Sequence, residues 1–164
     1  ESLLDAVVVG EGDYTFAEIC DGQDPQDILG LCYRDNNNEF QFTHGFYSMS
    51  IPQSAFMERL VSILEIIKAI SIYRIKANLL TRTSNIVENK FHQDAGEHEK
   101  LSKQWTTAIF YMNTNNGYTE FEDGTKVESV ANRIVTFPSN TMHRGTSSTD
   151  QDARVIINFN YFAK

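Results

Sequence analysis

The second half of the chain consists of short runs of β-forming residues, with turn sequences between them and no helical pattern. Val, Ile, Thr, Tyr and Phe are frequent in these runs, and such residues fit the pleated, half-buried surface of a sheet. The runs cover residues 72–80, 105–112, 126–130, 133–137 and 154–162. The segments between them are rich in Asn, Asp, Gly and Ser, which favour turns. Strands at this spacing predict a sandwich, a jelly roll or a barrel.

One amphipathic helix is expected before these runs, over residues 50–70. Pro52 suits a first helical turn. Apolar residues follow it at helical spacing, namely Phe56, Leu60, Ile63, Ile67 and Ile70. We expect this stripe to pack against the outer face of a sheet. The predicted fold class is therefore mainly β with an N-terminal helix.

The first fifty residues carry a weaker pattern. Fragments 6–9 and 40–47 show an alternating residue pattern, set among Asp, Asn and Gly, that predicts two edge strands. The polar segment 32–39 is interpreted either as a lid beside a site or as a solvated turn. The length of 164 residues is that of one domain. We expect residues 1–164 to form it, with a supporting region over about 1–73 and a β core over about 74–162.

Charge and apolar patterning exclude several function classes. The formal net charge of −8 repels phosphate backbones, so nucleic acid is a disfavoured partner. No run of about 20 apolar residues could span a bilayer, and the first residues lack the basic start of a signal peptide, which favours a cytoplasmic protein. Cys20 and Cys32 form no CxxC pair, so free thiols are predicted rather than a zinc site.

Of the four histidines, His92 and His143 fit a metal site best. His92 and Asp94 are two residues apart, so on an extended segment both side chains project to the same side. His143, just beyond a predicted strand and its Pro138 turn, supplies a third ligand. Two imidazoles and one carboxylate hold Fe(II) while leaving open positions for a chelating cosubstrate and O₂. His44 and His98 are predicted to be ordinary surface residues.

Arg154, at the start of the last predicted strand, is the natural partner for a dicarboxylate. A guanidinium fork binds a carboxylate through two parallel hydrogen bonds. Strand alternation gives Ile156, Asn158 and Asn160 the same face as Arg154, and this face is predicted to line a polar cavity. The hydroxyl of Tyr111, on the strand over residues 105–112, could assist the arginine.

The stretch over about 74–162 resembles the iron(II)- and 2-oxoglutarate-dependent oxygenases, and among them the prolyl-4-hydroxylase-like branch. The matching elements are, in order, residues 91–94, 107–113, 117–121 and 133–138, followed by His143 and Arg154. The resemblance implies that His92, Asp94 and His143 ligate iron. It also implies that Arg154 binds the C5 carboxylate of 2-oxoglutarate, with Tyr111 as a second cosubstrate contact. The implied fold is a double-stranded β-helix, a cupin-like jelly roll.

The chain departs from the family pattern at two turns, where Asn116 and Asn132 stand at positions at which glycine is common. Asn tolerates the left-handed backbone, so both turns are expected to form. Asp94 occupies the position that is a small residue in the related halogenases. The resemblance therefore implies a hydroxylase.

The sequence thus predicts a dioxygenase that uses Fe(II), 2-oxoglutarate and O₂ to hydroxylate a C–H bond, releasing succinate and CO₂. The substrate is a residue of a peptide or protein, with proline one possibility, or a small molecule. Trp105 and Tyr118 are interpreted as core rather than substrate-facing aromatics. Two alternatives stay open: a cupin-like module that binds a small ligand without turnover, and a metal-dependent isomerase or hydrolase that would not need Arg154.

Overall fold

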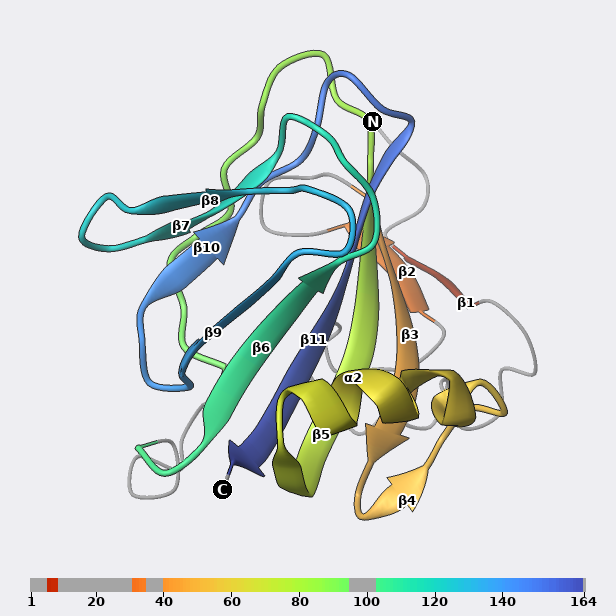
Figure 1. Cartoon of the computed structure of the whole chain (residues 1–164). Coiled ribbons are helices and arrows are strands. Elements are labelled where there is room, and N and C mark those ends of the chain that lie inside the picture. Colours follow the sequence, from red (N-terminus) through yellow and green to blue (C-terminus); the bar gives the residue numbers. More distant parts are fainter. Residues whose placement is uncertain (1–5, 9–30, 35–39, 95–102, 164) are drawn as a thin grey trace.

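The computed structural model describes residues 6–8, 31–34, 40–94 and 103–163, which form a large sheet and a small one (Figure 1). The large sheet contains, in spatial order, β1 (Ala6–Val8), β2 (Leu31–Arg34), β3 (Phe40–Ser48), β5 (Ala69–Thr81), β11 (Ala153–Ala163), β6 (Thr106–Tyr111) and β9 (Ile134–Pro138), while β4 (Ile51–Pro52) pairs with β3. The small sheet contains β10 (His143–Gly145), β7 (Tyr118–Phe121) and β8 (Lys126–Glu128) in that order. All described pairings are antiparallel.

Strand β11 organises the large sheet, because it pairs with β5 along one edge and with β6 along the other. Alternate side chains of a strand point to opposite faces. Ile156 therefore packs in an apolar cluster between the two sheets, whereas Ile157, Phe159 and Tyr161 belong to a second cluster on the outer face. The inner face of β11 is the one that carries Arg154.

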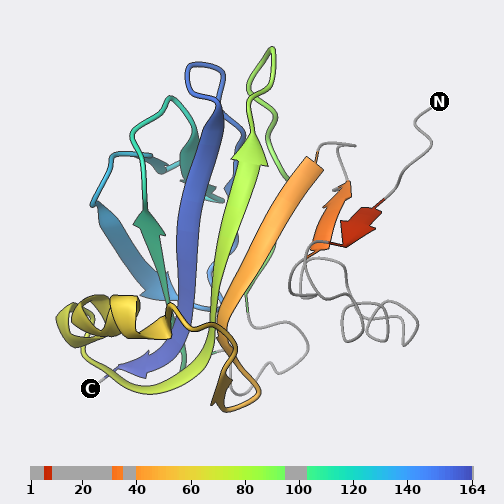
Figure 2. The same cartoon turned by 90° about the vertical axis from the view of Figure 1, so that its right-hand side faces the viewer.

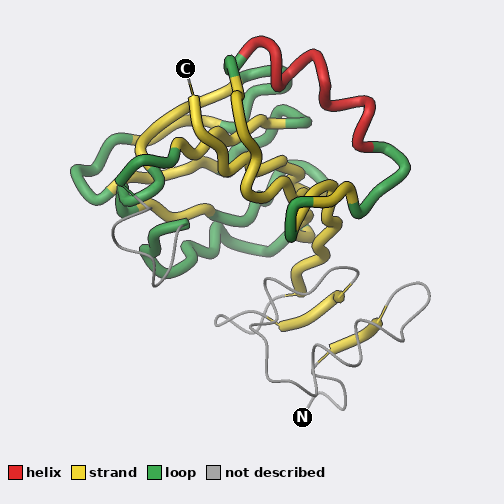
Figure 3. The backbone as a smooth tube through the Cα atoms, turned by 90° about the horizontal axis from the view of Figure 1, so that it is seen from below, coloured by secondary structure: helices red, strands yellow, loops and turns green. Residues whose placement is uncertain are grey.

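The outer face is covered by the helical segment, which consists of η2 (Met57–Leu60) and α2 (Val61–Ile66). Its buried residue Leu60 joins the outer cluster together with Ile67, which directly follows α2, and Ile75, Phe159 and Tyr161 from the sheet. Figure 2 shows this segment beside one end of the sheet, and Figure 3 shows it on the side away from β1 and β2. The inner cluster, between the sheets, is formed by Ile109, Tyr111, Phe137 and Ile156, with Phe121, Val127 and Val135 packed against it.

The mainly β architecture is confirmed, and the five predicted runs correspond to β5, β6, β8, β9 and β11. The helix is shorter than the predicted 50–70. Lys68 has a φ of 54° directly after α2, and Ala69 already begins β5. Phe56 and Ile70 are 62% and 67% exposed, so neither belongs to the buried stripe. The β-branched residues that follow Ile66 favour a strand, which outweighs their helical spacing.

Three strands correct the sequence interpretation. Tyr118–Phe121, which is not among the predicted runs, forms β7, and Leu31–Arg34, partly predicted as a lid or turn, forms β2. The run beginning at Phe40 is not an edge strand, because β3 lies between β2 and β5. His44 consequently lies on a strand rather than in a turn, where its Nε2 is 3.0 Å from Ser54 Oγ.

Some predictions fall outside the described residues. These concern His98, Cys20, the lid over 35–39, and the thiol of Cys32, of which only the backbone is described. Within the described ranges, no helix has both the length and the apolar character needed to cross a membrane.

The outer cluster predicts how the stability of the fold responds when a buried side chain of β11 is shortened. Phe159 is fully buried, so Phe159→Ala should lower the free energy of unfolding by about 3–5 kcal/mol through lost burial and a residual cavity. Chemical denaturation measures this. Ile66→Ala is the control, because Ile66 is 71% exposed and its loss should change stability by less than about 0.5 kcal/mol. Equal effects of the two substitutions would contradict the assignment of the core.

Candidate metal centre

Backbone pairing brings His92 and His143 together. His92 N donates to the carbonyl of His143 at 2.9 Å, and His143 N donates to that of His92 at 3.0 Å. Glu88 and Thr146 form a second bridge, so the chain before His92 runs along the edge of β10. Asp94 N then donates to the carbonyl of Ser139 at 3.3 Å. These bonds place three residues from two distant parts of the sequence at one point.

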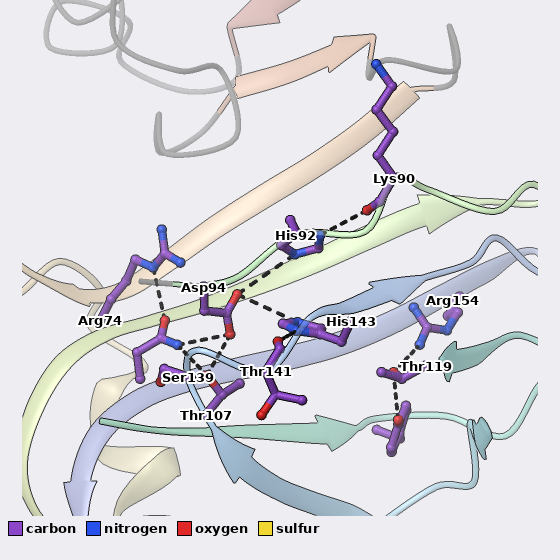
Figure 4. Close-up of polar contacts among 12 residues, drawn as sticks. Arg74, Lys90, His92, Asp94, Thr107, Thr119, Ser139, Thr141, His143 and Arg154 are labelled. Atoms are coloured by element: carbon purple, nitrogen blue, oxygen red, sulfur yellow. Dashed lines mark hydrogen bonds and ion pairs between the residues drawn. The ribbon is translucent and has the colours of Figure 1, made fainter. Parts of the chain in front are cut away.

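The side chains of the three residues converge (Figure 4). Asp94 Oδ1 is 3.9 Å from His92 Nε2 and 3.8 Å from His143 Nε2, and one ligand atom from each residue lies within 4.8 Å of the others. Neither distance is a hydrogen bond. The side chains of Asp94 and His143 are 4% and 3% exposed, while that of His92 is 47% exposed.

Each imidazole is oriented by a backbone carbonyl two residues earlier in the chain. His92 Nδ1 is 3.2 Å from the carbonyl oxygen of Lys90, and His143 Nδ1 is 2.9 Å from that of Thr141. A carbonyl can only accept, so Nδ1 carries the proton in the neutral ring. Nε2 of both rings is then an unprotonated ligand atom facing Asp94, an arrangement common for metal-binding histidines.

Hydrogen bonds to Oδ2, the second carboxylate oxygen, fix the orientation of Asp94. Thr107 Oγ1 donates to Asp94 Oδ2 at 2.8 Å, and Asn160 Nδ2 donates to the same atom at 3.1 Å. Thr107 and Ser139 hydroxyls are 2.9 Å apart, and Arg74 Nε donates to Asn160 Oδ1 at 3.3 Å. Oδ2 is thus occupied by hydrogen bonds, and Oδ1 is left facing the two histidines.

Burial and neighbouring charges change the pKa of two of these groups, Asp94 and His143. Burial alone would raise the pKa of Asp94, but the charges of His143 and Arg74 and the Thr107 hydrogen bond outweigh it and hold that pKa below its usual value. Burial lowers the pKa of His143, and the Asp94 carboxylate only partly offsets this. At neutral pH His143 is therefore neutral and Asp94 is ionised, which are the states that bind a metal.

This ligand set fits a divalent metal ion. Three lone-pair atoms face one another without a proton shared between them, which is unfavourable unless a cation lies among them. Ligand atoms bind such an ion at about 2.1 Å, so the three atoms would need to draw together by about 1 Å. Two histidines and one carboxylate match the facial triad of non-haem iron sites.

Arg154 is buried on the same interior face. Its side chain is 1% exposed, Nε donates to Ser129 Oγ at 2.9 Å, and Nη2 donates to Thr119 Oγ1 at 3.4 Å. Burial lowers its pKa to about 10, so the guanidinium is still charged at neutral pH. No carboxylate of the described residues contacts it. A buried cation whose partners among the described residues are all neutral is suited to bind an anion.

Two further residues shape the surroundings of Arg154. The Tyr111 hydroxyl donates to Thr119 Oγ1 at 2.8 Å, so Tyr111 and Arg154 share Thr119 as a partner. Burial raises the pKa of Tyr111, which stays neutral. Gly117 passes so close that a Cβ there would lie 2.7 Å from Arg154 Cδ and 2.6 Å from the Ser147 carbonyl. Only glycine lets the backbone approach the arginine this closely.

An ionic network lies beside the metal-binding residues. Arg144, which follows His143, bonds Glu88 Oε2 through Nη2 at 2.6 Å and Glu120 Oε2 through Nε at 2.8 Å. Its guanidinium also lies 4.5 Å from the ring centre of Phe91. Arg144 thereby ties β10 to β7 and to the segment that leads into His92.

The geometry brings together all the residues predicted for the site. His92, Asp94 and His143 form one cluster, and Arg154 and Tyr111 form a second within the same interior. The sequence analysis missed Thr119 and Ser129, the partners of Arg154. Residues 118–121 are Tyr, Thr, Glu and Phe, which show no clear alternation of apolar and polar side chains, so the strand β7 that carries Thr119 was not predicted.

The two aromatics interpreted as core differ in their surroundings. Trp105 is 6% exposed and stacks on Tyr73, with ring centres 4.2 Å apart. Tyr118 is half-buried, and its hydroxyl donates to Glu88 Oε1 at 2.7 Å. Trp105 is therefore a core residue, whereas Tyr118 belongs to the ionic network.

Comparison with known proteins identifies the fold. The nickel complex of the non-haem monooxygenase ThoJ matches with a TM-score of 0.55 and 12% identity, over 67% of this chain and 54% of that one. A cupin-like protein of Thermotoga maritima matches with a TM-score of 0.44 and 6% identity, over 75% of this chain and 69% of that one. The EutQ protein of Clostridium difficile matches with a TM-score of 0.42 and 10% identity, over 79% of this chain and 73% of that one. The sequence matches no protein-family model and no curated protein. The likeness to ThoJ supports a shared fold and nothing finer, and the prolyl-4-hydroxylase-like branch stays a prediction.

The hydrogen bonds on Asp94 predict the effect of a conservative change. Thr107→Val removes the hydroxyl at nearly constant shape, so Asp94 should lose its fixed orientation and Zn(II) affinity should fall about 10–100-fold. Isothermal titration of the metal-free protein measures this. Thr107→Ser keeps the hydroxyl and should bind as the wild type does. The same loss in both variants would assign the effect to packing instead.

The lowered pKa of His143 predicts a pH-dependent stability of the metal-free protein. Below the ordinary histidine pKa of 6.5, the unfolded chain takes up a proton that the folded chain resists. The free energy of unfolding should therefore fall as the pH decreases from about 7 to 5. Denaturation at several pH values measures the slope. His143→Gln should flatten it, and an unchanged slope in that variant would contradict the assignment.

Proposed function

We propose that the chain is an Fe(II)- and 2-oxoglutarate-dependent dioxygenase that hydroxylates a C–H bond. The observation that carries this proposal is the buried Arg154, which contacts no carboxylate of the described residues and shares an interior face with a histidine–aspartate–histidine cluster. A metal-binding hydrolase or isomerase needs the cluster but does not need Arg154 to hold a ketoacid. A dioxygenase that binds a dicarboxylate cosubstrate needs both.

In this proposal His92, Asp94 and His143 hold the iron, and Arg154 binds the distal carboxylate of 2-oxoglutarate. When bound, the iron and its cosubstrate supply the activation of O₂, with release of succinate and CO₂. The protein contributes position and electrostatics. Asp94 supplies one negative charge and the histidines none, so the ligand set leaves a divalent ion with a net positive charge for an anionic cosubstrate.

The surroundings of Arg154 prepare it for this role. Ser129 and Thr119 accept from Nε and Nη2, which fixes the plane of the guanidinium while leaving donors free for a carboxylate. Because the arginine is already desolvated, a carboxylate that reaches it gains more from the charge pair than it would in water. The Tyr111 hydroxyl donates to Thr119 in the structure, and as the second contact it would donate to the cosubstrate instead.

The substrate is a residue of a peptide or protein, with proline one candidate, or a small molecule. The structural likeness to ThoJ supports the fold on which such chemistry is found, and the acidic composition disfavours a nucleic acid. Membership of the prolyl-4-hydroxylase-like branch rests on the sequence resemblance.

Anaerobic titration with Fe(II) and then 2-oxoglutarate tests the proposal. The wild type should develop the visible charge-transfer band of a chelated ketoacid. His143→Ala should abolish the band, and Arg154→Ala should raise the 2-oxoglutarate concentration for half-saturation at least about 30-fold. His44→Ala is the matched control and should leave both steps unchanged.

Absence of the band in folded, iron-loaded wild type would refute the dioxygenase. Binding of 2-oxoglutarate without its consumption under O₂, across a panel of peptides and amino acids, would favour the cupin-like binding module. An Arg154→Ala variant with unchanged 2-oxoglutarate binding would remove the basis for the cosubstrate assignment.

A further inference from the structure

Two asparagines on the interior face of the large sheet have no role in the proposed reaction. Asn78 on β5 is 5% exposed, and Asn158 on β11 is 8% exposed. Neither Oδ1 has a hydrogen-bond partner among the described residues. A buried amide oxygen without a partner is unfavourable. Both atoms are therefore suited to accept a hydrogen bond from a bound molecule.

The strand register places these asparagines between the metal cluster and Arg154. Asn158 follows Arg154 by four residues and precedes Asn160 by two, so all three share one face of β11. Asn160 contacts Asp94, which fixes the end of this face that lies at the metal cluster. Asn78 pairs with Ile156, the residue between Arg154 and Asn158 on that face.

Asn78 and Asn158 are consequently diagonal neighbours on adjacent strands, about 7 Å apart. A single molecule can bridge this distance. Thr43 on β3 pairs with Asn78 and is 7% exposed, so the sheet continues as a buried polar wall beyond the pair.

We infer that Asn78 and Asn158 form a subsite that accepts N–H or O–H donors of the oxidised substrate, an inference that rests on the proposed function. 2-Oxoglutarate cannot donate a hydrogen bond to either oxygen, because at neutral pH it carries two carboxylates and a ketone and has no hydrogen on oxygen or nitrogen. The chemistry of the two oxygens selects a substrate with an amide, ammonium or hydroxyl group close to the carbon that is oxidised. Asn78 and Asn158 then determine specificity.

The first test uses the wild type and two small probes. N-Methylacetamide carries one amide N–H, and N,N-dimethylacetamide carries none. The readout is the ¹H–¹⁵N NMR signals of the Asn78 and Asn158 side chains in the full chain loaded with Zn(II) and 2-oxoglutarate. N-Methylacetamide should shift these signals saturably, and N,N-dimethylacetamide should leave them in place. An equal response to both probes, or a response to neither, would overturn the inference.

Substitutions identify the atoms responsible. Asn158→Leu and Asn78→Leu should each weaken N-methylacetamide binding about fivefold to tenfold, as expected for one lost hydrogen bond. Asn158→Asp keeps acceptor oxygens and should still bind N-methylacetamide. Asn85→Leu is the matched control, because Asn85 is exposed and lies outside this face. Leucine variants that bind the probe as the wild type does would contradict the assignment.

The charge-transfer titration separates this inference from the proposed function. In the leucine variants, half-saturation by 2-oxoglutarate should change less than about twofold. A larger loss of 2-oxoglutarate affinity would show that the asparagines bind the cosubstrate. That result would overturn the inference and leave the proposed dioxygenase function standing. If the wild type gives no band yet still distinguishes the two probes with Zn(II) alone, the proposed function falls and the donor-accepting subsite stands.

Discussion

The antiparallel bridge between His92 and His143 is the interaction on which the site depends. Its two backbone hydrogen bonds join segments that are distant in the sequence, and they do so without any contribution from the imidazoles. The rings are then free to turn their Nε2 atoms toward Asp94. Because backbone geometry sets the position and carbonyl contacts set the ring orientation, the ligand atoms can face one another before a metal binds.

The interior between the sheets divides into two chemical regions. One part is apolar and is filled by residues such as Ile109 and Phe137. Elsewhere on the inner face, β5 and β11 carry the buried polar residues Asn78, Arg154, Asn158 and Asn160. If this face served stability alone, apolar side chains would be expected at these positions, since buried polar groups require hydrogen-bond partners. The polar wall is thus more consistent with ligand binding than with packing alone.

The residues that the sequence analysis selected lie near one another in the structure, whereas parts of the surrounding fold differ from the prediction. His92 and Asp94 were identifiable because their spacing matches strand geometry, and the alternation of β11 assigned Arg154 and Asn160 to one face. The helix was overextended because Ile67 and Ile70 continue a helical spacing while preferring extended backbone. Thr119 and Ser129 carry no recognisable local pattern, and their role arises only when β7 and the segment after β8 fold over Arg154.

The unequal burial of the three candidate metal ligands has a kinetic consequence for an ion bound there. Asp94 and His143 are enclosed, whereas nearly half of the His92 side chain is open to solvent. An ion leaving the cluster would first break its bond to the residue that solvent can reach. The rate of metal exchange, and hence the resistance of the loaded protein to a chelator, would then be governed by how firmly Lys90 and the neighbouring ionic network hold one imidazole.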